Sequence, residues 1–184
     1  MNESKIVVRY AKALFEFADD KNKLDIVKKD IDYIRSLCEV KEFKEILDTP
    51  IIQPSKKQYI IHNIIKDNIC EETLNFINLI TKNRREKYLP GILRKFIADY
   101  YKNKNIKPAI LTTSIEIEEK LRNRIINVIK SVYKTEVIVE DRIDPSIIGG
   151  FILTVEDQQY DASVASKLKD FNYKLVHETF KKVE

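Results

Sequence analysis

The sequence predicts an α+β protein that is mainly α-helical, with an N-terminal six-helix bundle over residues 1–105 and a small mixed α/β domain over residues 106–184. Two observations lead to this fold class. Apolar residues recur at spacings of three and four through the first part, which is the period of a helix that packs on one face. The second part instead alternates short β-branched runs with helical patterns. A polar, lysine-rich stretch at residues 102–107 marks the boundary between the two domains.

The first three helices are predicted by their apolar stripes. The first stripe is Val7, Ala11, Leu14 and Ala18, and the second is Leu24, Val27, Ile31, Ile34 and Cys38. A short third helix surrounds Phe43 and Leu47. It must end before the segment "DTPIIQP", because Pro50 and Pro54 interrupt helical hydrogen bonding.

Three further helices complete the predicted bundle. The segments "KKQYIIHNII" and "EETLNFINLITK" form the fourth and fifth, and the sixth begins near Pro90, a residue that suits the first turn of a helix. Ser4 and Ser55 are candidate N-caps for the first and fourth helices. Because the connections between these segments are short, neighbouring helices are expected to pack against one another as a bundle.

The second domain is predicted as strand, helix, strand, strand and helix. The strands are "PAILTTS", "TEVIVE" and "GFILTV", and the segment "IEEKLRNRIINVIKSVY" is the helix between the first two. The last helix carries an apolar stripe of Leu168, Phe171, Leu175 and Val176. This order of elements indicates a small mixed sheet with helices packed on it.

Composition narrows the class of protein. Of the 184 residues, 43% are hydrophobic and 34% are charged, as in soluble globular proteins with a real core. No stretch approaches the ~20 apolar residues of a membrane span, and the N-terminus resembles neither a secretory signal nor a transit peptide. We therefore expect the chain to act in a bacterial cytoplasm. The basic excess behind the net charge of +4 lies in residues 1–105, which permits an acidic partner there.

Two adjacent glycines, Gly149 and Gly150, raise the possibility of a phosphate-binding loop. Such a loop follows a strand and opens a helix, whereas these glycines precede the strand "FILTV". We therefore predict that they form a turn, in which glycine permits a positive φ or a close backbone approach. Asp161 or Ser163 is then expected to cap the last helix.

The sequence indicates no catalytic residue, no cofactor and no metal site. His62 and His177 are isolated, as are Cys38 and Cys70, which we interpret as small core residues in a reducing compartment. The basic run "KNRREK", residues 82–87, is either a charged corner between helices or a contact to RNA. An RNA-binding helical bundle of the antitermination-factor type is thus an alternative function, although it leaves the second domain without a role.

The first helix has a second apolar stripe, formed by Tyr10, Ala13 and Phe17. A helix that is apolar on two faces is either wholly buried or offers one face to a partner. Asn75 and Leu79 of the fifth helix are expected beside this stripe. Either these side chains close the bundle, or they line a groove for an amphipathic helix.

Three segments occur in an order that is specific to one family. They are "RYAKALFEFA", "TKNRREKYLPGILRKF" and "RIDPSIIGGFILTVEDQQYDASVASKL". Together with "DTPIIQPSKK" they resemble the delta subunit of F-type ATP synthase, the oligomycin-sensitivity-conferring protein of mitochondria. The chain departs from the family pattern at Ala165 and Ser166, and at Arg84, where the family often has the glycine of an Asn-Gly-Arg segment.

The resemblance implies a structural subunit and not an enzyme. It implies that residues 1–105 bind the N-terminal helix of the alpha subunit, with the first and fifth helices forming the surface. It implies that residues 106–184 bind the C-terminus of the stalk b subunit, so that the catalytic head does not turn with the rotor. The expected location is the cytoplasmic face of the bacterial membrane, as a peripheral protein without nucleic acid.

Overall fold

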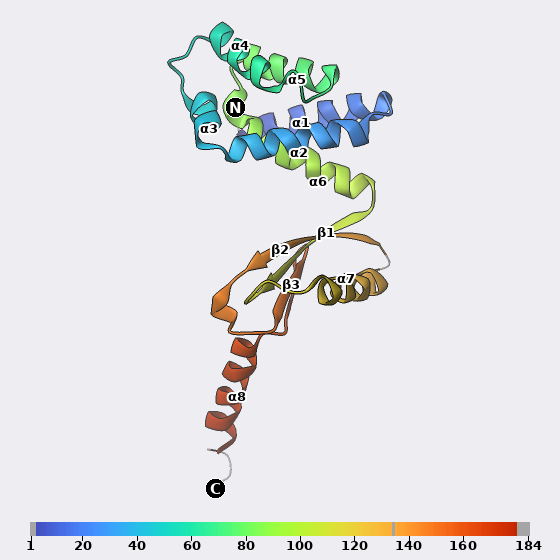
Figure 1. The fold of residues 1–184 in the computed structure, drawn as a ribbon, viewed down its shortest axis with the longest axis vertical. Coiled ribbons are helices and arrows are strands. Elements are labelled where there is room, and N and C mark those ends of the chain that lie inside the picture. The colour runs from blue at the N-terminus through green and yellow to red at the C-terminus, as the bar shows by residue number, and fades with distance from the viewer. Residues whose placement is uncertain (1–2, 134, 180–184) are drawn as a thin grey trace. The chain divides into compact units, whose positions relative to one another are not determined.

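The computed structural model describes residues 3–133 and 135–179. The chain divides into two compact units, Met1–Asn103 and Lys104–Glu184. The first unit is α-helical and the second contains a sheet (Figure 1), so the predicted α+β class with mainly helical content is confirmed. Among the described residues, no helix combines the length and the apolar character of a membrane span.

The first unit consists of helices joined by short connections. They are α1 (Glu3–Asp20), α2 (Leu24–Glu39), α3 (Lys41–Asp48), α4 (Pro54–Ile65), α5 (Glu71–Lys82), the 3-10 turn η1 (Glu86–Tyr88) and α6 (Leu89–Asn103). Two predicted caps are wrong. Helix α1 already includes Ser4, and α4 begins at Pro54, so that Ser55 lies inside the helix. Proline takes the first helical position because the N–H group that it lacks would have no partner there.

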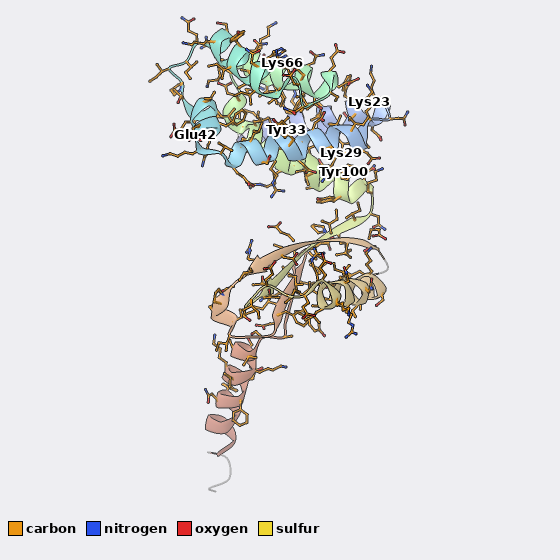
Figure 2. The ribbon with its side chains drawn as sticks, viewed as in Figure 1. Lys23, Lys29, Tyr33, Glu42, Lys66 and Tyr100 are labelled. Carbon is orange, nitrogen blue, oxygen red and sulfur yellow. The ribbon has the colours of Figure 1, made fainter. Side chains whose placement is uncertain are left out.

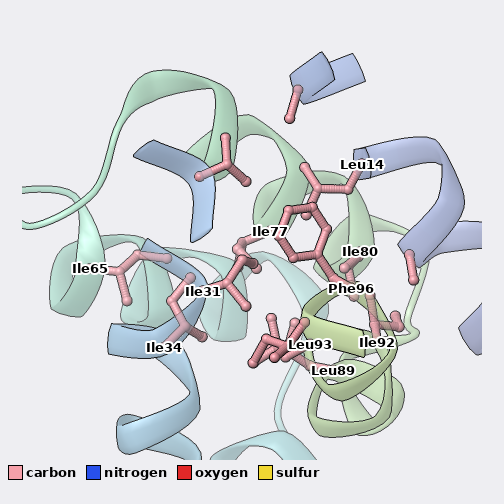
Figure 3. Close-up of a cluster of buried hydrophobic side chains, with 14 of the residues drawn as sticks. Leu14, Ile31, Ile34, Ile65, Ile77, Ile80, Leu89, Ile92, Leu93 and Phe96 are labelled. Carbon is pink, nitrogen blue, oxygen red and sulfur yellow. The ribbon is translucent and has the colours of Figure 1, made fainter. Parts of the chain in front are cut away.

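The apolar stripes of these helices meet in a single core (Figure 3). Its largest fully buried side chains include Leu14, Ile31, Ile34, Ile65, Ile77, Ile80, Leu89, Ile92, Leu93 and Phe96. The predicted stripe of α2 is buried from Leu24 to Ile34, while Cys38 is half-buried at the edge of the core. Burial of each Leu or Ile side chain contributes about 1.5–3 kcal/mol, so this core holds the helices together.

A buried ion pair ties the proline-containing loop to the rest of the unit. The Lys57 ammonium lies 2.7 Å from Glu86 Oε1, and its side chain is only 3% exposed. The same Nζ donates to the carbonyl oxygens of Leu47, at 3.2 Å, and Thr49, at 2.8 Å. These three acceptors match the three N–H donors of the ammonium. The end of α3, the start of α4 and η1 are therefore held at one point.

The second unit is built on a mixed four-stranded sheet with the order β2-β1-β3-β4. The strands are β1 (Ile106–Thr113), β2 (Glu136–Ile143), β3 (Phe151–Val155) and β4 (Gln158–Asp161). Strand β1 pairs parallel with β2 and antiparallel with β3, and β4 extends β3 as a hairpin. The sequence prediction missed β4. Its residues "QQYD" are polar and exposed, so they show no apolar alternation, and the strand is defined by its pairing with β3.

Helix α7 (Glu119–Tyr133) packs on one face of this sheet (Figure 1). The small core between them contains Ile129 of α7, Ala109, Val137 and Val155. These strand residues share a face because side chains alternate along a strand, and because Ala109 is paired with Val155 across β1 and β3.

The last helix, α8 (Val164–Thr179), does not pack on the sheet as predicted. It follows β4 in the chain, contacts the 3-10 helix η2 (Pro145–Ile147), and projects from the sheet in Figure 1. Leu168 and Phe171 of its apolar stripe are 51% and 60% exposed. The side chains of Leu175 and Val176 lie outside the described residues. The stripe is present, but the described part of the chain does not supply the surface that would cover it.

Candidate partner-binding surfaces

Helices α1 and α5 form an open groove of about 640 Å³ on the first unit. Its lining includes Tyr10, Ala13, Phe17, Asn75 and Leu79, the residues predicted from the second apolar stripe. Ala13 is exposed, and Phe17 and Leu79 are 45% and 49% exposed. We refer to this surface as the α1–α5 groove. The side chains of Ala13, Phe17 and Leu79 are therefore accessible and are not used to close the bundle.

Tyr10 organises one end of the α1–α5 groove. Its ring makes an edge-on contact with the ring of Phe76, with centroids 6.3 Å apart and planes at 62°. Its hydroxyl oxygen accepts hydrogen bonds from Asn83 Nδ2, at 3.2 Å, and from Arg85 Nη1, at 3.3 Å. The Arg85 guanidinium carbon lies 5.5 Å from the centre of the Tyr10 ring, which is a cation–π distance. Tyr10 is thus held in place from two sides.

The other end of the α1–α5 groove lies beside Phe17. Lys23, in the turn between α1 and α2 (Figure 2), pairs with Glu72 Oε1 at 2.6 Å. The hydrogen bond from Lys23 lowers the pKa of Glu72 to about 2 and raises the pKa of Lys23. Because Tyr10 meets Asn83 at the end of α5 while Lys23 meets Glu72 at its start, α1 and α5 run in opposite directions along the groove.

Sequence reasoning missed several side chains that line the same groove. They are Arg9, Glu72, Phe76, Asn83 and Arg85. Phe76 packs against the core of the unit and also lines the groove. The signal for Arg85 was the basic run at residues 82–87, but a run of charges does not show which of its members folds back over a neighbouring helix.

A second groove, of about 420 Å³, lies between α7 and the β3–β4 hairpin. Val128 and Val132 of α7, which are 62% and 69% exposed, form one side, and Leu153 and Tyr160 lie on the other. We refer to it as the α7 groove. It exists because α7 covers the sheet only in part, leaving apolar side chains of the hairpin accessible.

The turn with the paired glycines connects β2 to β3. Gly150 has φ +77, and a Cβ atom placed there would meet the Ala162 carbonyl oxygen at 2.4 Å. At Gly149 the nearest neighbour of such a Cβ is Val164 Cγ2 at 3.4 Å, an ordinary contact. Because Gly150 has no Cβ atom, the backbone at Ala162, just before α8, can pass close to it.

Asp161 and Ser163 organise the start of α8. Asp161 Oδ1 accepts from the Ser163 N–H at 2.8 Å, and Ser163 Oγ accepts from the Ser166 N–H at 3.2 Å. Hydrogen bonds that Asp161 accepts from Ser163 and from the Ser166 hydroxyl lower the pKa of its carboxyl, since they favour the charged form. Ser163 thus occupies the N-cap position and satisfies an N–H of the first helical turn.

An open apolar groove on one unit, with a second groove and an apolar helix face on the other, is typical of a protein that joins other proteins. The chain belongs to the ATP synthase delta (OSCP) subunit family, whose model matches residues 6–175. The family is that of a non-catalytic component of the ATP synthase stator, or peripheral stalk. The alternative of an RNA-binding helical bundle is not supported.

Individual relatives match almost the whole chain. An "ATP synthase subunit delta" of Desulforamulus reducens is 30% identical over 172 residues, covering 93% of this chain and 95% of the relative. One of Amoebophilus asiaticus is 35% identical over 165 residues, covering 89% and 90%. A chain in the mitochondrial ATP synthase hexamer of Toxoplasma gondii has a similar fold, with a TM-score of 0.75 at 24% identity, covering 92% of this chain and 97% of that one.

Proposed function

We propose that this protein links the catalytic head of an F-type ATP synthase to its peripheral stalk and resists the torque of the rotor during proton-driven ATP synthesis. In this proposal residues 1–105 bind the N-terminal helix of an alpha subunit, and residues 106–184 bind the C-terminus of the b subunit. The protein then acts at the cytoplasmic face of the bacterial membrane as a peripheral component. The observation that carries the proposal is the α1–α5 groove.

The shape and chemistry of this groove suit an amphipathic helix. Ala13 is small and lies between the aromatic side chains of Tyr10 and Phe17, so a helix can approach the backbone of α1 closely there. Leu79 presents an accessible apolar side chain from α5. Burial of about 400 Å² of apolar surface at ~25 cal/mol/Å² gives a gross gain on the order of 10 kcal/mol. Association and ordering costs remove a large share, which leaves an affinity in the micromolar to nanomolar range.

The second unit offers two apolar surfaces that a stalk helix can cover. These are the α7 groove and the α8 face with Leu168 and Phe171. Helix-in-groove contacts of this type bury apolar side chains of the partner at helical spacing. Attachment at both units increases the effective concentration of each contact, so the complete linkage is tighter than either contact alone.

Binding of the full chain to a peptide of the alpha subunit N-terminus tests the proposal. We expect Ala13→Asp to weaken binding by more than about tenfold, because the bound helix would cover an unpaired carboxylate. The melting temperature should change little, since Ala13 is exposed in the free protein. Ser36→Asp, at an exposed position of α2, is the matched control and should leave binding unchanged.

Two results would contradict parts of the proposal. If Ala13→Asp unfolds the protein, the stripe is needed for the fold and the groove does not accept a helix. If no alpha peptide binds the wild-type chain, and head and stalk subunits fail to copurify with a tagged version from the native membrane fraction, the linkage itself is wrong.

A further inference from the structure

The Tyr10 end of the α1–α5 groove carries a positive charge that the described residues do not neutralise. Arg85 and Arg9 both line the groove, and within the described ranges neither takes part in an ion pair. The only carboxylate among the lining residues, Glu72, lies toward the opposite end and is already paired with Lys23. The groove is therefore asymmetric, with unpaired cationic side chains at one end.

Arg85 is prepared to receive an anionic group. It is half-buried, and its guanidinium lies over the Tyr10 ring while Nη1 donates to the Tyr10 hydroxyl. Since guanidinium has five N–H donors, several remain for another acceptor. The contacts with Tyr10 restrict the side chain, so less conformational entropy is lost when a carboxylate binds in the bidentate manner that arginine favours.

A helix that fills the groove must approach this guanidinium. An apolar helix would take water from Arg85 without replacing the lost hydrogen bonds, which is unfavourable for a charged group. We infer that the occupant of the α1–α5 groove is an amphipathic helix with a carboxylate side chain at the end that meets Tyr10, where it pairs with Arg85. This pairing selects one of the two directions in which the helix can lie. The inference rests on the proposed function, because it assumes that a helix binds in this groove.

Synthetic amphipathic helical peptides provide the test. Four peptides share one apolar stripe and differ in a single side chain beside it. Three of them carry Glu, Gln or Lys at the same end of the helix. The fourth carries Glu at the opposite end. Binding to the full chain is measured by calorimetry. We expect the first peptide to bind about tenfold more tightly than the Gln peptide, as for a hydrogen-bonded charged pair. The peptide with Glu at the opposite end should lose this advantage.

Variants of Arg85 assign the effect to that residue. Arg85→Gln should weaken binding of the Glu peptide about tenfold and change the Gln peptide little. Arg85→Glu should invert the preference, so that the Lys peptide binds more tightly than the Glu peptide. Arg94→Gln, at an exposed position of α6, is the matched control and should change neither. Arg85→Lys keeps the charge, and so retains part of the preference even if loss of the ring contact lowers the melting temperature.

The outcomes separate this inference from the proposed function. If the Glu and Gln peptides bind equally well, or if the preference persists in Arg85→Gln, the carboxylate pairing is wrong although helix binding stands. If no peptide binds and the alpha subunit peptide also fails to bind, the groove is not a helix site and the proposed function fails at this surface.

Discussion

The two units use their apolar residues differently. The first unit buries most of its large apolar side chains in one core and leaves the α1–α5 groove as an accessible surface. The second unit has a small core around Ile129, and its helices α7 and α8 expose Val128, Val132, Leu168 and Phe171. The difference indicates that the first unit is stabilised mainly by its own packing, whereas the second leaves much apolar surface for partners to cover.

Core truncations should give the largest effects and should test this difference directly. Phe96→Ala removes a fully buried ring from the first core and should lower its free energy of unfolding by about 3–5 kcal/mol. Ile129→Ala should cost the second unit about 2 kcal/mol, the low end for such changes, because the adjoining α7 groove lets neighbours relax. Hydrogen exchange resolved by segment measures each unit separately. Tyr59→Ala, on the exposed side of α4, is the control. Equal losses of unfolding free energy in the Phe96 and Ile129 variants would contradict this difference between the two units.

Gly150→Asp should destabilise the second unit by about 2–3 kcal/mol, because the new side chain must adopt a positive φ and meets the Ala162 carbonyl. Amide hydrogen exchange should become faster in the sheet, while the amides of the first unit should keep their protection against exchange. Gly149→Ala is the matched control, since its Cβ makes only an ordinary contact. If Gly150→Asp retains native protection in the sheet, or if saturable nucleotide binding is found at this turn, its assignment as a structural glycine is wrong.

Ser163→Ala should have a smaller effect that is confined to α8. Loss of the N-cap bond to the Ser166 N–H should destabilise this helix by about 1 kcal/mol. The first turn of α8 should then exchange faster. Ser131→Ala is the control, because its hydroxyl bonds to the Val128 carbonyl within α7 and caps no helix. Unchanged exchange at the start of α8 would show that Asp161 alone fixes the turn.

Arg84→Gly should give the smallest effect and the opposite sign. Arg84 has φ +56, a conformation that costs a residue with a Cβ atom about 1–2 kcal/mol. Glycine relieves this cost but adds entropy to the unfolded chain. The first unit should therefore gain about 0.5–1 kcal/mol, measured by urea unfolding. Lys82→Gly is the control, because it lies inside the last turn of α5, where glycine should instead destabilise the first unit. A loss of stability in Arg84→Gly would mean that its side chain makes a contact worth more than the strain.

The helices of the first unit could be predicted because their apolar periodicity and their burial agree. Val27, Ile31 and Ile34 follow helical spacing and are fully buried. Strand β4 could not be predicted in this way, since its polar residues are ordered by backbone pairing with β3. The packing of α8 was predicted incorrectly for a related reason. An apolar stripe shows that a helix has a surface to cover, but it does not show whether the same chain covers it.

The α1–α5 groove shows the same limit of sequence-based prediction for single residues. The stripe of Tyr10, Ala13 and Phe17 could be read from α1 alone, because helical spacing places them on one face. Arg85 could not be assigned, because its position over Tyr10 depends on how the connection after α5 folds back. The charge at the groove end is therefore a property of the tertiary structure.

The position of β1 has a mechanical consequence. Helix α6 ends at Asn103 and β1 begins at Ile106, so the chain enters the sheet through a strand that is bonded on both sides, to β2 and to β3. Hydrogen bonds between strands run largely across the strand direction. A pull along the chain from Ile106 would therefore load the bonds on both sides in shear, many at once, whereas an edge strand can be peeled away one bond at a time. We expect this entry point to yield at a higher force than an entry through β4 would.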